Sequence, residues 1–117
     1  VHGLVASKEK AAYVAAKHGV VGFTKSLALE TARTGITANT ICPGWVLTPL
    51  VQQQIDKRIA EGVPPEQARD RLLAEKQPSV EFVTPEQLGE LALFLCSEGA
   101  VNVRGAAWNM DGGWVAQ

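Results

Sequence analysis

Apolar and small residues surround most of the segment 7–34, which is rich in alanine and contains no proline. This pattern predicts one long helix, with Gly35 as its stop signal. A helix that is apolar on most sides is buried on most sides. We therefore expect this helix to pack against partners beyond those that a small monomer offers.

The remaining pattern predicts five shorter elements. They are a strand over 36–42, two polar helices over 49–61 and 65–76 that resemble a surface lid, a helix over 84–97 and a strand over 106–110. Thr84, Pro85 and Gln87 form a helix-start signal with a capping box. The order indicates an α/β protein. Because an α/β sheet covered on both faces needs more than two strands, we expect the end of a larger parallel-sheet domain.

Composition excludes several classes of function. The chain has 117 residues with 11 Lys and Arg against 12 Asp and Glu, which argues against nucleic-acid and polybasic membrane surfaces. No apolar run approaches the roughly 20 residues that span a bilayer, and no signal peptide is evident. Cys42 and Cys96 are expected to be buried free thiols, and the protein to be cytoplasmic. The chain begins at Val1, which suggests a piece of a longer protein or a removed start.

Tyr13 and Lys17 carry the most distinctive candidate chemistry. Residues four apart share one helix face, and a nearby cation favours the phenolate, which lowers the pKa of a tyrosine. Tyr13 is then a candidate acid and base near neutral pH. The spacing alone is weak, because an exposed tyrosine over a solvated lysine gives the same pattern.

Further motifs follow in a fixed order: Asn39-Thr40-Ile41-Cys42-Pro43-Gly44-Trp45-Val46-Leu47-Thr48-Pro49, then the capped helix, then Arg104-Gly105 and Asp111-Gly112-Gly113. With Tyr13-x-x-x-Lys17, this series resembles the C-terminal half of the short-chain dehydrogenase/reductase family over essentially the whole chain. The resemblance implies the C-terminal part of a Rossmann-type, doubly wound parallel sheet. It places residues 1–117 in the catalytic and substrate-binding part of one domain, with a lid segment over 49–83. It also implies an oxidoreductase that uses NAD.

The resemblance assigns roles to matching residues. Tyr13 matches the catalytic acid/base, and Lys17 the residue that depresses the tyrosine pKa and binds the nicotinamide ribose. Pro43, Gly44 and Val46 match the segment that meets the nicotinamide carboxamide, and Thr48 a hydroxyl in the same contact.

Candidate substrate contacts surround these residues. A hydroxy acid brings a carboxylate that needs hydrogen-bond donors. Lys10 lies three residues before Tyr13, and His2 and Gln54 add neutral donors; these three match carboxylate-binding residues in the enzymes that the chain resembles. Trp45, and less clearly Trp114, would wall the methyl end of the substrate. Solvated charges, an exposed lid glutamine and core filling are the plain alternatives.

Parts of the family pattern are missing. The serine expected thirteen residues before Tyr13 falls one position before Val1, and no phosphate-binding glycine-rich loop or ribose-binding acid is present. We therefore expect the isolated chain to be inactive. NAD over NADP rests on the resemblance alone, as does a homotetramer that uses the long helix and the C-terminal helix and strand. No metal site is predicted, although the carboxylate of Gln117 leaves one open at the C-terminus.

Two alternatives remain at this stage. One is a different short-chain dehydrogenase, such as a 3-oxoacyl-thioester reductase or a sugar dehydrogenase. The other is a non-catalytic piece that acts only in subunit assembly.

Overall fold

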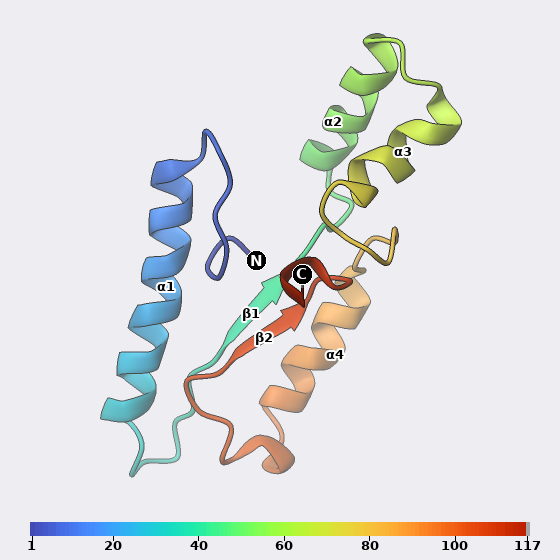
Figure 1. The fold of residues 1–117 in the computed structure, drawn as a ribbon. Coiled ribbons are helices and arrows are strands. Elements are labelled where there is room, and N and C mark those ends of the chain that lie inside the picture. Colours follow the sequence, from blue (N-terminus) through green and yellow to red (C-terminus); the bar gives the residue numbers. More distant parts are fainter. Residues whose placement is uncertain (117) are drawn as a thin grey trace.

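A computed structural model describes residues 1–116 of the chain (Figure 1). The elements, in order, are α1 (Ala11–Glu30), β1 (Thr40–Pro43), α2 (Pro49–Ala60), α3 (Pro65–Ala74), α4 (Pro85–Leu95), a 3-10 turn η1 (Glu98–Ala100), β2 (Ala107–Met110) and a 3-10 turn η2 (Trp114–Ala116). The predicted order of helix, strand, two lid helices, helix and strand is confirmed, and the two short turns η1 and η2 were not predicted.

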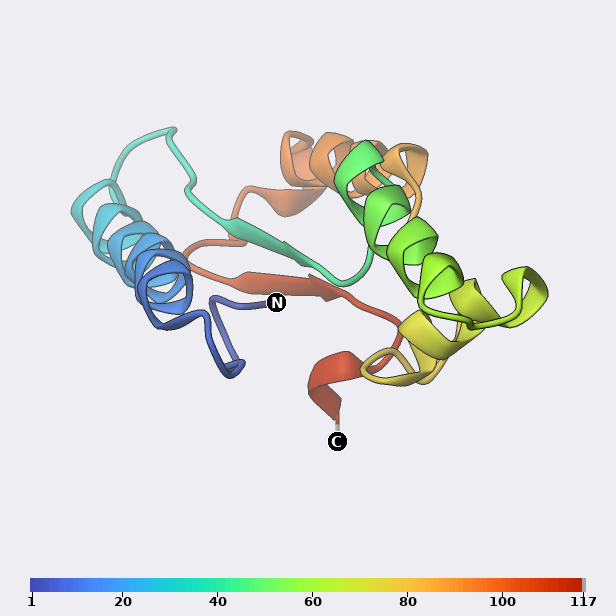
Figure 2. The same ribbon diagram turned by 90° about the horizontal axis from the view of Figure 1, so that it is seen from above.

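β1 and β2 lie side by side and parallel, with Thr40 opposite Ala107 and Pro43 opposite Met110. Helix α1 flanks this pair on one side and α4 on the other (Figures 1 and 2). Parallel strands with helices at both flanks confirm the α/β class. Both strands end at the same edge, next to the first residues of the chain and the final turn.

Helix α1 is shorter than predicted at both ends. It begins at Ala11, not Ser7, because Glu9 has a φ of 62° and cannot continue a right-handed helix. It ends at Glu30, and Thr31, not Gly35, follows it as the C-cap. Within this chain only Val21 and Ala28 of α1 are buried, so burial of its other sides by partners stays a prediction. Its apolar outer face, which includes Phe23 and Leu29, is exposed.

The first predicted strand is also shorter, since its ladder begins at Thr40 instead of residue 36. The preceding backbone is held by side chains. The Arg104 guanidinium donates to the carbonyl oxygens of Thr34 and Ile36, and the Asn39 amide donates to Val103 O at 2.8 Å. These side chains take the place of a neighbouring strand.

Helices α2 and α3 pack against each other and form the predicted lid with a small core of its own. Val51, Ile55, Ala68 and Leu72 are its buried residues. Thr48 is the N-cap residue of α2, and its hydroxyl accepts from Val51 N at 3.3 Å. The Arg58 guanidinium pairs with both carboxylate oxygens of Glu75, which ties α2 to the residue that follows α3.

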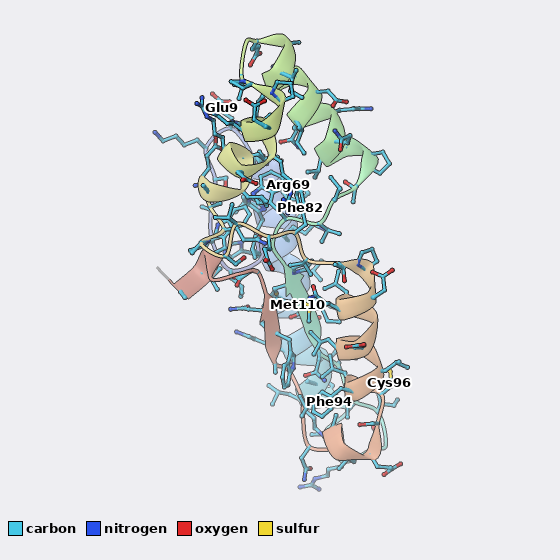
Figure 3. The ribbon with its side chains drawn as sticks, turned by 90° about the vertical axis from the view of Figure 1, so that its right-hand side faces the viewer. Glu9, Arg69, Phe82, Phe94, Cys96 and Met110 are labelled. Atoms are coloured by element: carbon cyan, nitrogen blue, oxygen red, sulfur yellow. The ribbon has the colours of Figure 1, made fainter. Side chains whose placement is uncertain are left out.

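Helix α4 has the capping box that the sequence predicts, with reciprocal bonds between Thr84 and Gln87. At its far end the Phe94 ring packs edge-on against Trp108 of β2, at 5.8 Å between centroids. Cys96 follows Leu95 and is exposed (Figure 3), so the prediction of a buried thiol is wrong there. Cys42, in β1, is buried as predicted. Neither cysteine forms a disulfide.

None of the helices in residues 1–116 is long and apolar enough to cross a membrane.

Candidate active site

A cavity of about 640 Å³ opens between α1, the end of β1 and the start of the lid. It lies at the carboxyl edge of the parallel strands, where ligands bind in open α/β sheets. All ten residues proposed from the sequence line it: His2, Lys10, Tyr13, Lys17, Pro43, Gly44, Trp45, Val46, Thr48 and Gln54. Trp114 lines it as well.

Tyr13 and Lys17 lie one turn apart on α1, on the face that borders the cavity. The Lys17 ammonium is 5.4 Å from the centroid of the Tyr13 ring. The Tyr13 side chain is half exposed. A phenol open to the cavity and beside a cation is suited to proton transfer with a bound molecule.

Four aromatic rings form a continuous series along one wall. His2 meets the Tyr13 ring edge-on at 5.6 Å and the Trp114 ring edge-on at 5.6 Å, and Trp114 lies 5.8 Å from Trp45. Edge-to-face contacts at these distances are favourable for aromatic pairs. The series connects the phenol on α1 to the start of the lid and the C-terminal turn.

His2 is held from two sides, because its Nε2 is also hydrogen-bonded to Ser7 Oγ at 2.9 Å. Burial lowers the pKa of His2, and the positive charges of Lys10, the N-terminus and Lys76 lower it further. At neutral pH the ring is therefore neutral. The same charges make this part of the cavity attractive to an anion. Lys76 was not singled out by the sequence, because only the fold brings the end of the lid near His2.

Lys10 does not lie within the helix as predicted; it is the N-cap residue of α1. Its carbonyl accepts from Val14 N at 2.8 Å, so its backbone is fixed by the helix start while its side chain is exposed and borders the cavity. Gln54 reaches the cavity from α2, as the sequence predicts for a lid residue.

Hydrogen bonds donated by its backbone N–H groups hold the turn after β1. Gly44 N donates to Met110 O at 2.9 Å, and Trp45 N donates to the side-chain oxygen of Gln77 at 2.8 Å. Val46 forms an isolated parallel bridge with Val83. Thr48 accepts a bond as the cap of α2, and its hydroxyl proton stays available to a ligand.

Trp114 is placed by Asp111, the buried carboxylate of the terminal Asp-Gly-Gly motif. Asp111 accepts from Gly113 N at 3.1 Å and from Val115 N at 3.0 Å. Gly112 and Gly113 have φ angles of 56° and 92°, which glycine adopts at little cost. The motif is thus a tight turn that aims Trp114, which is 8% exposed, at the cavity.

The cavity fits a nicotinamide group. The aromatic ring of Trp45 and the aliphatic side chains of Val46 and Val20 supply apolar walls for the nicotinamide ring. The Lys17 ammonium and the Thr48 hydroxyl supply donors at the same opening.

The described residues contain no cluster of side chains suited to bind a metal ion. In residues 1–116, His, Cys, Asp and Glu side chains do not gather in any group of three that could hold a metal ion. The C-terminal carboxylate of Gln117 lies outside the described residues.

Comparison with known proteins defines the class. The family described as enoyl-(acyl carrier protein) reductase, in the short-chain dehydrogenase/reductase group, matches residues 1–115. The chain belongs to this family, which confirms the resemblance drawn from its motifs. Over 117 residues it is 71% identical to the D-beta-hydroxybutyrate dehydrogenase of Cupriavidus necator and 51% identical to that of Rhizobium meliloti. These alignments cover 99% of the chain and 45% of each relative, so the chain spans less than half of their length.

The solved structures agree on the fold. Actinorhodin polyketide ketoreductase with NADPH superposes with a TM-score of 0.84 and 42% identity, over 96% of this chain and 43% of that one. The Rossmann-type α/β architecture predicted from the sequence is thereby confirmed.

Proposed function

We propose that this chain forms the catalytic and substrate-binding part of an NAD-dependent dehydrogenase that interconverts D-3-hydroxybutyrate and acetoacetate. One observation carries the proposal: the Tyr13–Lys17 pair lines the same cavity as three candidate hydrogen-bond donors for a substrate carboxylate. The 71% identity to a D-beta-hydroxybutyrate dehydrogenase supports the same substrate.

Tyr13 is the proposed acid and base. Its phenol oxygen takes the proton of the substrate hydroxyl during oxidation and returns it during reduction. The Lys17 ammonium lies 5.4 Å from the centroid of the Tyr13 ring, and it would also donate to the ribose of a bound cofactor. A nicotinamide bound in this cavity would supply the acceptor for the hydride that leaves the hydroxyl-bearing carbon.

The substrate carboxylate would bind among His2, Lys10 and Gln54. Lys10 supplies the cation, while the neutral His2 ring and the Gln54 amide supply hydrogen-bond donors. Trp45 and Trp114 form the apolar wall against which the substrate methyl group would pack. An acid of four carbons thus meets charge at one end and aromatic surface at the other.

The cofactor would lie against the turn after β1. Pro43, Gly44 and Val46 line the cavity and would present backbone groups to the carboxamide, and the Thr48 hydroxyl would donate its proton there. NAD, not NADP, is proposed from the hydroxybutyrate dehydrogenases that the chain resembles. Binding should involve residues beyond this chain, since no phosphate-binding glycine-rich loop occurs in it.

Assembly and location complete the proposal. The exposed apolar residues of α1 and α4, among them Phe23, Leu29 and Leu93, are candidates for the interfaces of a cytoplasmic homotetramer.

A ketoreductase acting on a thioester is the rival within the family. Such an enzyme would share Tyr13 and Lys17, but its substrate is a thioester, which does not require three hydrogen-bond donors for a carboxylate. The positive charges of Lys10 and Lys76 near His2 favour the acidic substrate over this rival.

The test is turnover by the full-length protein with purified substrates. We expect NADH to form from D-3-hydroxybutyrate and NAD, with the L-enantiomer and NADP as poor alternatives. The isolated 117-residue chain should be inactive, and mixing it with the separately produced remainder should restore activity. Association without activity would instead support a role in assembly alone.

A further inference from the structure

Gln77 is an uncharged polar side chain enclosed beneath the turn that lines the cavity. It follows α3 at the end of the lid, and only 1% of its surface is exposed. Its backbone N–H donates to Leu73 O at 2.8 Å, so the residue extends the last turn of the helix. Burying an amide is unfavourable unless its oxygen and its NH₂ group find partners.

The Gln77 side chain bridges the two ends of the lid. Its Oε1 accepts from Trp45 N at 2.8 Å, just before the lid, and its Nε2 donates to the carbonyl oxygen of Glu81, in the last residues of the lid. Val83 N donates to Trp45 O at 2.9 Å. Both polar groups of the Trp45 backbone are therefore held, one by the side chain of Gln77 and one by the segment that Gln77 fixes.

Two glycines of the sequence motifs make room for this side chain. A Cβ atom at Gly44 would collide with Gln77 Oε1 and would lie 2.9 Å from the Asp111 Cα atom. A Cβ atom at Gly112 would lie 2.6 Å from Gln77 Cγ. The Pro43-Gly44 turn and the Asp-Gly-Gly turn thus approach the same amide from two sides.

We propose that Gln77 is a positioning residue for the active site. By fixing the Gly44–Trp45 backbone, it sets the turn proposed to meet the nicotinamide and places the Trp45 ring against the cavity. Its effect on turnover rests on the proposed function, whereas its effect on the Trp45 backbone does not. The substitution Gln77→Met keeps the volume and removes both hydrogen bonds, and Gln53→Met makes the same change at an exposed site on α2.

Two measurements on the full-length protein test this role. Gln77→Met should speed amide hydrogen exchange at Trp45 and lower kcat/KM for D-3-hydroxybutyrate by about tenfold, well below the melting temperature of the variant. Gln53→Met should change neither quantity. Normal exchange at Trp45 with unchanged kcat/KM in Gln77→Met would overturn the proposal. If the wild-type protein does not oxidise the acid but Gln77→Met still speeds exchange at Trp45, the proposed function fails while the positioning of Trp45 by Gln77 stands.

The substitution Gln77→Glu distinguishes the effect of the two hydrogen bonds from the effect of side-chain volume at this position. A neutral glutamic acid can accept from Trp45 N and donate to the Glu81 carbonyl, whereas its carboxylate can only accept. The ratio of kcat/KM between Gln77→Glu and Gln77→Met should therefore rise as pH falls. The ionisable side chains that face this position, Asp111 on the terminal turn, Glu90 on α4, and Lys76 and Glu81 on the flanking segment, are present in both variants. A ratio that does not vary with pH would contradict the bridging role.

Discussion

The Lys17 ammonium lies 5.4 Å from the centroid of the Tyr13 ring, one helical turn further along α1. The phenol opens into the same cavity that His2, Lys10 and Gln54 line. The residues proposed for proton transfer and those proposed to bind an acid thus line one cavity.

Tyr13→Phe removes the phenol oxygen and leaves the ring contact with His2 in place. We expect kcat of the full-length protein to fall by about 10² to 10⁴-fold, because the proton acceptor is lost. Steady-state rates with D-3-hydroxybutyrate measure the effect. Lys17→Ala should also lower kcat, whereas Lys25→Ala, at an exposed position two turns further along α1, should not. A fully active Tyr13→Phe variant would refute the assignment.

Lys10→Ala should raise KM for D-3-hydroxybutyrate about tenfold or more and change kcat little, because a charge-assisted hydrogen bond to the carboxylate is lost. Lys8→Ala removes an exposed charge from the same segment and provides the matched control. An unchanged KM in Lys10→Ala would favour the thioester reductase instead.

Leu72→Ala should destabilise the lid by about 2–5 kcal/mol, because Leu72 is 1% exposed in the small core between α2 and α3. Urea unfolding followed by circular dichroism measures the loss. The exposed lid substitution Gln53→Ala should leave the unfolding midpoint almost unchanged. Equal midpoints for the two variants would show that the lid core contributes little.

His2 should make the protein more sensitive to acid. Burial, followed by the ammonium of Lys10, lowers its pKa in the folded chain from the usual 6.5. The unfolded chain therefore binds a proton that the folded chain does not, so stability falls as pH drops through 6.5 toward the folded pKa. His2→Asn should flatten this part of the pH profile in urea unfolding. Parallel profiles for the two proteins would contradict the lowered pKa.

The sequence predicted which elements occur better than it predicted where they begin and end. Proline and capping signals located α2 and α4, because these signals act within a few residues. The starts of α1 and β1 were misplaced, since Glu9 adopts a left-handed conformation and Arg104 binds the backbone from far along the chain. Tertiary contacts of this kind leave no local pattern.

The same limit applies to the site. The ten residues proposed from motifs and resemblance line one cavity, but no motif includes Gln77 or Lys76. Gln77 is one glutamine among several in the lid, and only the approach of Gly44 and Gly112 distinguishes it.

The most direct test compares kcat/KM of the full-length protein for D-3-hydroxybutyrate and for its methyl ester, with NAD. The ester lacks the carboxylate charge and carries one additional methyl group. The account predicts at least about a tenfold preference for the acid, as expected for a charge-assisted contact. An equal or higher kcat/KM for the ester, or no oxidation of the acid, would contradict it.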